Sequence, residues 1–149
     1  IQLAPMLEEI CTDLAPLAEK RNITLECSGD AAMVGSDALI YRLLFNLTEN
    51  AIKYNRPGGR VKAMATQTET EVFIRVSDTG CGIQPEFQRS IFQPFFRVDK
   101  SRSRQYGGAG LGLSLVWEIA NLHAGRVWVE ESSEKGTTMA VQLPVGKKE

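Results

Sequence analysis

Three polar residues in the stretch Asn46 to Tyr54 have a spacing that could do chemistry. Asn46, Asn50 and Lys53 are spaced i, i+4 and i+7, so on a helix they share one face. A carboxamide oxygen is a ligand that suits Mg²⁺, and a lysine ammonium is a point charge for phosphate. The pattern predicts a surface for an anionic, metal-bearing ligand. An ordinary solvated helix face has the same residue types, so this stretch alone leaves both interpretations open.

A second candidate site is Asp78-x-Gly80-x-Gly82, which follows a predicted strand. A buried carboxylate can accept a hydrogen bond from an exocyclic amino group, which favours adenine over guanine. Gly80 and Gly82 would let the backbone approach a flat ligand without a Cβ between them. The alternative is an ordinary tight turn. An aspartic protease is excluded, because it needs a second such element and a far larger chain.

A third candidate is the glycine-rich run 107–113, which has four glycines in its first six positions and precedes a predicted helix. Free backbone N–H groups and the helix dipole bind phosphate oxygens at such a place. The run lacks the Gly-Lys-Ser/Thr ending of a P-loop and comes late in the chain, so neither a P-loop NTPase nor a dinucleotide-binding fold is indicated.

Four basic residues precede that run: Arg97, Lys100, Arg102 and Arg104. A flexible basic lid could cover a triphosphate and stabilise charge on the γ-phosphoryl. For at least two of the four, a solvated charged loop is the alternative.

The elements that must position these residues follow from apolar periodicity. Helical spacing predicts helices over 3–20, 36–54 and 111–123, with a short one at 85–90. Pro16 should kink the first helix or end it early, and Ser36 or Asp37 should cap the second, whose buried stripe ends at Ala51. Alternation predicts strands at 23–27, 60–67, 71–77, 126–130 and 137–143, and a short one at 32–34.

Composition limits the function classes. The chain has 149 residues, 43% hydrophobic and 23% charged, with a net charge of -1. These values indicate one globular domain and give no argument for nucleic acid or an anionic membrane as partner. Because the chain starts at Ile1, we expect a fragment of a longer protein. Three separated cysteines (Cys11, Cys27 and Cys81) predict neither a disulfide framework nor a zinc site.

Five motifs, in this order, resemble one family. Asn46 to Tyr54 is similar to an N box, and Asp78 to Gly82 to a first glycine box. Phe92-x-x-Phe95-x-Arg97 is similar to an F box and Gly108 to Leu113 to a second glycine box, and Gly136-Thr137-Thr138 matches the short last box. Together they resemble the catalytic, ATP-binding domain of a bacterial sensor histidine kinase, within the superfamily of gyrase, Hsp90 and MutL. The resemblance covers residues 1–144.

The resemblance implies a fold and a set of roles. The fold would be an α/β sandwich, with a mixed, mostly antiparallel sheet covered on one face by three helices, and ATP between the helices and a flexible lid. Asn46, Asn50 and Arg97 would be catalytic, with Asn50 the Mg²⁺ ligand and Arg97 facing the γ-phosphoryl. Lys53 would contact phosphates, and Asp78 would read the adenine amino group, with Thr137 helping through water. The implied ATP-binding set is Asn46, Asn50, Lys53, Tyr54, Asp78, Gly80, Gly82, Ile83, Arg97, Lys100, Gly108, Ala109, Gly110, Leu111, Gly112, Leu113 and Thr137.

Asn46 separates the branches of this superfamily. Hydrolysing members have a glutamate there that activates water, and an amide cannot accept a proton at neutral pH. Glu49 is a nearby carboxylate that could complicate this argument. His123-Ala124-Gly125 replaces the usual His-Gly-Gly, and we expect His123 to be structural.

The resemblance also implies partners and leaves two alternatives. The phosphoacceptor histidine would lie on a separate dimerisation domain of a homodimeric parent, which would pass the phosphoryl to a response regulator. This chain should therefore bind ATP but not phosphorylate itself, as a cytoplasmic domain of a parent anchored in the membrane through other segments. The alternatives are a hydrolytic ATPase or anti-sigma-type serine kinase of the same superfamily, and a non-enzymatic interaction module with this fold.

Overall fold

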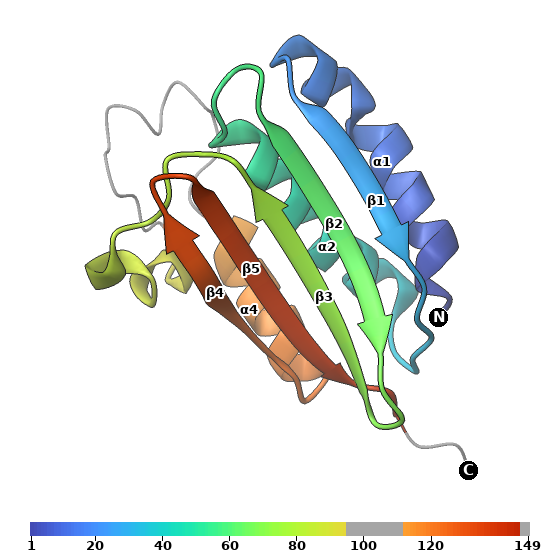
Figure 1. Ribbon diagram of the computed structural model, residues 1–149. Helices are drawn as coiled ribbons and strands as arrows, with labels where there is room; N and C mark the ends of the chain where they lie inside the picture. Colours follow the sequence, from blue (N-terminus) through green and yellow to red (C-terminus); the bar gives the residue numbers. More distant parts are fainter. Residues whose placement is uncertain (95–111, 147–149) are drawn as a thin grey trace.

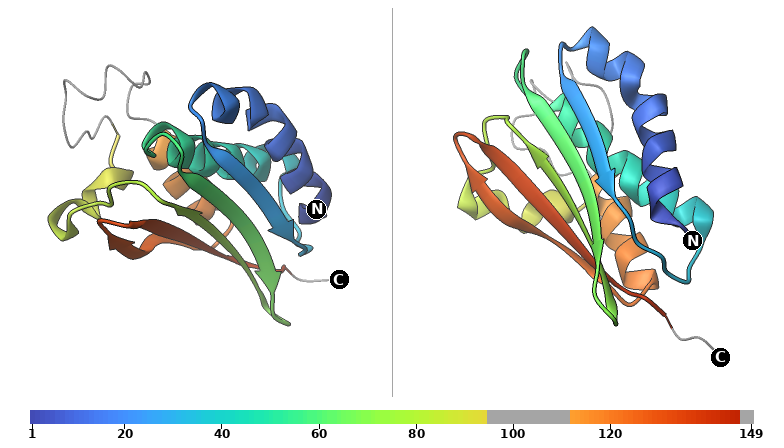
Figure 2. Two further views of the ribbon diagram at one scale, coloured as in Figure 1. Left: turned by 45° about the horizontal axis from the view of Figure 1, so that its top comes forward. Right: turned by 45° about the vertical axis from the view of Figure 1, so that its right-hand side comes forward.

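In the part of the chain that the structure describes, the fold consists of one sheet and three α-helices. The computed structural model describes residues 1–94 and 112–146. Five strands form a sheet in the order β1-β2-β3-β5-β4. Helices α1 (Leu3–Lys20), α2 (Asp37–Lys53) and α4 (Gly112–Leu122) lie on one face of it (Figures 1 and 2). The predicted sandwich, with three helices on one face of the sheet, is confirmed.

The sheet is mixed and mostly antiparallel. Its strands are β1 (Thr24–Gly29), β2 (Arg60–Gln67), β3 (Glu71–Asp78), β4 (Arg126–Ser133) and β5 (Gly136–Pro144). β1 pairs parallel with β2, and the other three pairs are antiparallel. Side chains alternate between the faces, so Val72, Ile74 and Val76 of the central strand are buried in the core. Asp78 is the last residue of β3 and is therefore held at the end of a central strand.

Helix α1 does not end early at Pro16, contrary to that expectation. It continues one full turn to Lys20. Proline removes one backbone hydrogen bond, but Leu14 and Ala18, on either side of it, are both buried against the core. Their packing holds the last turn in place.

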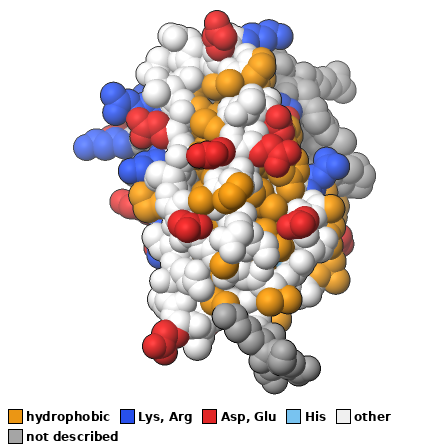
Figure 3. All heavy atoms as spheres, turned by 90° about the vertical axis from the view of Figure 1, so that its right-hand side faces the viewer, with side chains coloured by type: hydrophobic (Ala, Val, Ile, Leu, Met, Phe, Trp, Pro, Cys, Tyr) orange, Lys and Arg blue, Asp and Glu red, His pale blue; other side chains and the backbone are white. Residues whose placement is uncertain are grey.

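Acidic side chains lie among hydrophobic ones on the side of the molecule that α1 and β1 form (Figure 3).

Two predicted elements differ in the structure. Residues 32–34 do not form a strand, because Met33 N–H bonds to Ile1 O and Val34 N–H to Val145 O. These partners lie in different segments, so only an isolated bridge between Gln2 and Ala32 results. The predicted helix 85–90 is instead two short 3₁₀ turns, Pro85–Phe87 and Ser90–Phe92.

His123 has the structural role expected of it. Its Nε2 accepts a hydrogen bond from Ser36 N–H at 3.2 Å, and its Nδ1 lies 2.9 Å from Ile119 O. With Nε2 as an acceptor, the proton is on Nδ1, which donates to that carbonyl. The ring therefore ties the end of α4 to the start of α2, where the Ser36 hydroxyl accepts from Leu39 N–H as the predicted cap.

Candidate functional site

The polar face predicted on α2 is present. Ile40, Leu44, Leu47 and Ala51 are buried, while Asn46, Asn50 and Lys53 are half-buried on the other side of the helix. Within the described chain the Asn50 amide makes no side-chain hydrogen bond, so its oxygen is available to a ligand. Lys53 Nζ lies 3.7 Å from Glu49 Oε1, one turn back on the same helix.

Asn46 links this face to the start of α4. Its Nδ2 donates to the carbonyl of Gly112 at 3.4 Å, and Gly112 is the first residue of α4. A carboxylate at this position could not donate that bond. The amide therefore suits both the local structure and a site without a general base at position 46.

The Asp78 carboxylate is held by one of its two oxygens. Oδ1 accepts from Gly80 N–H at 2.9 Å and from Thr137 N–H at 3.1 Å. In residues 1–94 and 112–146, Oδ2 has no hydrogen-bond partner. Burial raises the pKa of Asp78, and the two backbone N–H groups partly oppose that rise. The carboxyl group is thus fixed in direction and has one oxygen free to accept a donor from a ligand.

Three segments are packed tightly around this carboxylate. A Cβ on Gly80 would lie 2.8 Å from the Tyr54 carbonyl oxygen, at the end of α2. A Cβ on Gly136, whose φ is +143°, would lie 1.9 Å from the Asp78 carbonyl oxygen. Both positions need glycine, because a side chain would force the segments apart. The structure therefore brings the end of α2, the Asp78 loop and the β4–β5 turn together.

Ser132 belongs to the same cluster and was missed in the sequence. Its hydroxyl accepts from Ile83 N–H at 2.7 Å and lies 2.9 Å from the Thr137 hydroxyl. Ser132 and Thr137 are directly opposite each other in the β4–β5 ladder. The predicted strand ended at residue 130, and extending the hairpin to its turn at Gly136 would have placed this pair.

Comparison with known protein families gives a match over most of the chain. The family described as "Histidine kinase-, DNA gyrase B-, and HSP90-like ATPase" matches residues 35–147. The chain belongs to this family.

Named relatives of this ATPase domain are sensor kinases. This chain is 38% identical over 146 residues to the sensor histidine kinase RppB of Synechocystis sp., and the match covers 96% of this chain and 32% of RppB. It is 39% identical over 107 residues to WalK of Bacillus subtilis, covering 70% of this chain and 18% of WalK. The chain thus spans about a third or less of the length of these relatives.

Solved structures share the fold over almost the whole domain. A nucleotide-free catalytic domain of the histidine kinase ThkA has a TM-score of 0.82 at 26% identity, covering 99% of this chain and 97% of that one. The mycobacterial sensor histidine kinase MprB has a TM-score of 0.81 at 26% identity, covering 97% and 96%. These matches also cover α1 and β1, which lie before the residues of the family match.

Some predicted nucleotide-binding positions of this histidine kinase-like ATPase domain are not described. Arg97, Lys100, Gly108, Ala109, Gly110 and Leu111 all lie outside the described residues. Of the others, Tyr54 caps α2 with 45% of its surface exposed, and Ile83 and Leu113 pack against the core. Phe92, the first residue of the F box, packs against Trp117 of α4 with the rings tilted by 35° and their centroids 5.6 Å apart.

The donor set fits Mg²⁺ held jointly with phosphate. Among the residues that the structure describes, no group of three or more His, Cys, Asp or Glu side chains could hold a metal. Mg²⁺ is commonly held by one or two protein oxygens together with substrate phosphates and water. The unengaged Asn50 amide, with Glu49 one residue before it, fits that kind of site.

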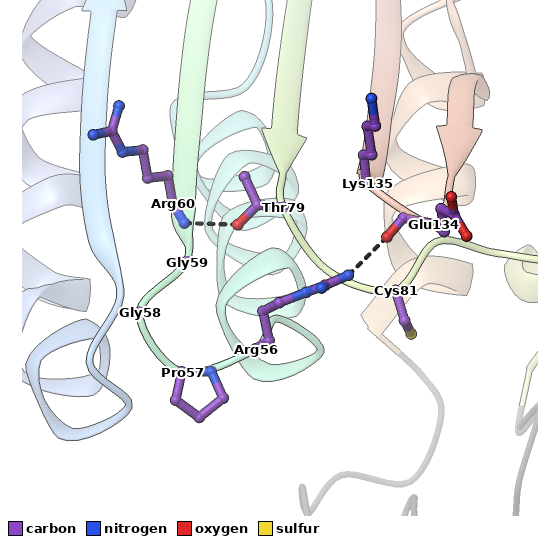
Figure 4. Close-up of a pocket in the computed structure, with 9 residues that line it drawn as sticks. All are labelled: Arg56, Pro57, Gly58, Gly59, Arg60, Thr79, Cys81, Glu134 and Lys135. Carbon is purple, nitrogen blue, oxygen red and sulfur yellow. Dashed lines mark hydrogen bonds between the residues drawn. The ribbon is translucent and has the colours of Figure 1, made fainter.

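A hollow of about 730 Å³ lies at the end of the sheet, next to this site. Its walls come from the loop between α2 and β2, from Thr79 and Cys81, and from the β4–β5 turn (Figure 4). None of Asn46, Asn50, Lys53 or Asp78 lines it. The hollow is therefore lined by other residues than those predicted to bind the nucleotide.

Proposed function

We propose that this domain binds Mg-ATP and donates the γ-phosphoryl to a histidine on a separate dimerisation domain, for relay to an aspartate of a response regulator. The observation that carries the proposal is the Asp78 carboxylate, held through Oδ1 by Gly80 and Thr137 and packed beside the end of α2. One helix then bears groups for metal and phosphate, and its end adjoins a group that can read adenine.

In this proposal each end of the nucleotide has its own residues. Asp78 Oδ2 accepts a hydrogen bond from the adenine amino group, and Asn50 provides an oxygen to Mg²⁺. Lys53 leaves Glu49 for a phosphate, which is easy because a half-exposed i, i+4 ion pair contributes only about 0.3–0.5 kcal/mol. Arg97, Lys100 and the backbone of Gly108 to Leu113 complete the phosphate end, as their motifs imply.

Asn46 directs the phosphoryl group to protein instead of water. An amide cannot take a proton from water, so position 46 provides no general base for hydrolysis. In the transfer, the bond between the γ-phosphorus and the bridging oxygen breaks, and ADP leaves with the electron pair. A bond forms from the unprotonated imidazole nitrogen of the acceptor to phosphorus, and the proton on the other imidazole nitrogen passes to a base outside this domain. This domain contributes positioning and charge neutralisation.

The partners follow from the relatives. ThkA has been solved in complex with the response regulator TrrA, and that chain matches 98% of this one at 25% identity with a TM-score of 0.79. We propose a homodimeric parent whose dimerisation domain bears the acceptor histidine, with this domain on the cytoplasmic side of a membrane-anchored sensor. Among the described residues, no helix is long and apolar enough to span a membrane.

The test is reconstitution of the transfer. The domain is mixed with the dimerisation domain of the same parent and γ-labelled ATP, and the label on protein is followed. We expect acid-labile, alkali-stable phosphohistidine on the dimerisation domain and no label on this domain alone. ATP binding without any labelled histidine in the mixture would refute the proposal.

A hydrolytic role is the second candidate, because Glu49 is a carboxylate on the same face as Asn50. If Glu49 activates water, the isolated domain should release phosphate from ATP, and Glu49→Gln should abolish the release. We expect negligible release from both proteins, since the Asn46 position lacks a base. Glu49→Asp serves as a matched variant that keeps the carboxylate.

A further inference from the structure

The loop between α2 and β2 contains an arginine that contacts two separate parts of the site. Arg56 Nη2 donates to the carbonyl of Gly80 at 3.0 Å and to the carbonyl of Glu134 at 2.7 Å. Figure 4 shows its side chain extending from the loop toward Glu134 at the β4–β5 turn. A single guanidinium nitrogen therefore joins the loop after β3 to the turn before β5.

The two carbonyls belong to the two segments that hold Asp78. Gly80 donates its N–H to Asp78 Oδ1, and its C=O is bound by Arg56. Glu134 lies three residues before Thr137, the other N–H donor to the same oxygen. Arg56 thus bridges the two segments that supply the donors to the Asp78 carboxylate.

The loop itself is built to keep Arg56 in place. Asn55 Oδ1 accepts from Arg56 N–H at 2.8 Å, and Asn55 Nδ2 donates to Arg60 O at 2.9 Å. The Thr79 hydroxyl donates to Asn55 Oδ1 at 3.1 Å and accepts from Arg60 N–H at 2.9 Å. These bonds fix the loop against the residue that separates Asp78 from Gly80, so the Arg56 side chain starts from a constrained backbone.

We propose that Arg56 is a positioning residue of the nucleotide site, which sets the spacing of the Gly80 and Thr137 N–H donors and thereby the direction of the Asp78 carboxylate. The inference rests on the proposed function in so far as Asp78 reads adenine. Arg56 also follows Lys53 by only three residues, so the loop connects the phosphate end of α2 to the adenine end of the site.

Neighbouring residues provide a matched control. Arg60 is the first residue of β2, directly after this loop, and lines the same hollow, but its side chain makes no hydrogen bond or ion pair within residues 1–94 and 112–146. In Figure 4 the Arg60 side chain points away from Glu134. Arg60→Ala therefore removes the same charge as Arg56→Ala without removing the bridge. Arg56→Lys keeps an ammonium that can donate to both carbonyls.

The experiment has two readouts on wild type and these three variants. The first is amide hydrogen exchange by NMR, without nucleotide, at Gly80 and Thr137, with Ile74 in the buried centre of β3 as reference. We expect Arg56→Ala to accelerate exchange at Gly80 and Thr137 by tenfold or more and to leave Ile74 unchanged. The second is the Kd for Mg-ATP, which we expect to rise about tenfold in Arg56→Ala.

Arg60→Ala should behave as wild type in both readouts, and Arg56→Lys should recover part of both effects. If the Gly80 and Thr137 amides exchange at the same rate in Arg56→Ala as in Arg60→Ala, the inference is overturned. Equal acceleration at Ile74 would also overturn it, since the role would then be general stability. Unchanged ATP affinity with loosened amides would overturn the link to binding. If wild type binds no ATP, the proposed function fails, and the exchange data still decide whether Arg56 holds the donors.

Discussion

Replacing Asp78 by asparagine tests the adenine-reading carboxylate without changing its shape. In the structure, Asp78 Oδ1 accepts two backbone N–H bonds, and an asparagine Oδ1 can accept both of them. The asparagine NH₂ then takes the position of Oδ2. A donor would face the adenine amino group, which is also a donor, and the hydrogen bond between them would be lost.

The size of the effect follows from the loss of one charge-assisted hydrogen bond. Such bonds contribute about 1.5–3 kcal/mol, so the Kd for ATP should rise roughly 10- to 160-fold. GTP should lose less affinity or gain some, because the new NH₂ can donate to the guanine carbonyl. Stability without nucleotide should be unchanged or higher, since burial raises the pKa of Asp78 and the ionised carboxylate is therefore disfavoured in the folded state at neutral pH.

Calorimetry with ATP and GTP, and urea unfolding without nucleotide, measure these effects. Asp30→Asn is the matched control, because Asp30 is exposed and undergoes the same chemical change. ATP affinity of Asp78→Asn within a factor of two of wild type, with the fold intact, would refute the reasoning. A large loss of stability in the variant would contradict the claim that Oδ1 alone satisfies the two N–H groups.

The Asp78→Asn variant also isolates the part of the pH dependence of ATP binding that comes from Asp78. A raised pKa means that Asp78 takes up a proton at a higher pH than an exposed aspartate does. ATP binding, which needs the ionised form, should therefore weaken as the pH falls through that raised value. The ratio of wild-type to Asp78→Asn affinity removes the titration of the phosphates themselves, and it should decrease toward one on acidification. A ratio that does not change with pH would contradict the role of the ionised Asp78 carboxylate in ATP binding.

Three further outcomes are expected. His123→Ala should lower the free energy of unfolding in urea by about 1–3 kcal/mol, because it leaves the backbone N–H at the start of α2 without its acceptor. Burial raises the pKa of Cys27 to about 12 from 9.0, so at pH 8 iodoacetamide should modify Cys27 much more slowly than a model thiol, and exposed Cys81 should be labelled first. Gly82→Ala should destabilise the domain by about 1–3 kcal/mol in the same urea assay and weaken ATP binding, since φ is +84° and the new Cβ would lie 2.1 Å from Ser133 O.

The elements could be predicted because the pattern and the packing agree. In α2, each residue of the predicted apolar stripe is buried, and Ser36 caps the helix. Pro16 shows where local rules fail, because proline is unfavourable inside a helix in isolation and tertiary burial of its neighbours outweighs that preference. Residues 32–34 show a second limit. Their alternating pattern predicts a strand, but it cannot reveal whether a single partner strand runs alongside all three residues to bond with them.

The residues of the site could be predicted where a motif places them, and not where a contact spans the chain. Asn50 and Asp78 are predicted from spacing and local chemistry. Arg56, by contrast, is one arginine in a turn, and its partners lie 24 and 78 residues further along the chain. Ser132 likewise becomes part of the site only through its register opposite Thr137. Such contacts depend on the sheet order, which a single sequence does not specify.

The account depends most on one claim, that the polar face of α2 and the Asp78 loop form a Mg-ATP site. The direct measurement is calorimetric titration of the nucleotide-free domain with ATP, in Mg²⁺ and in EDTA, for wild type and Asn50→Ala. We predict binding by wild type in Mg²⁺, weaker binding in EDTA, and in Asn50→Ala an affinity that is lower and nearly independent of Mg²⁺. No binding of ATP by wild type in Mg²⁺ would contradict the account and favour an interaction module that keeps only the fold.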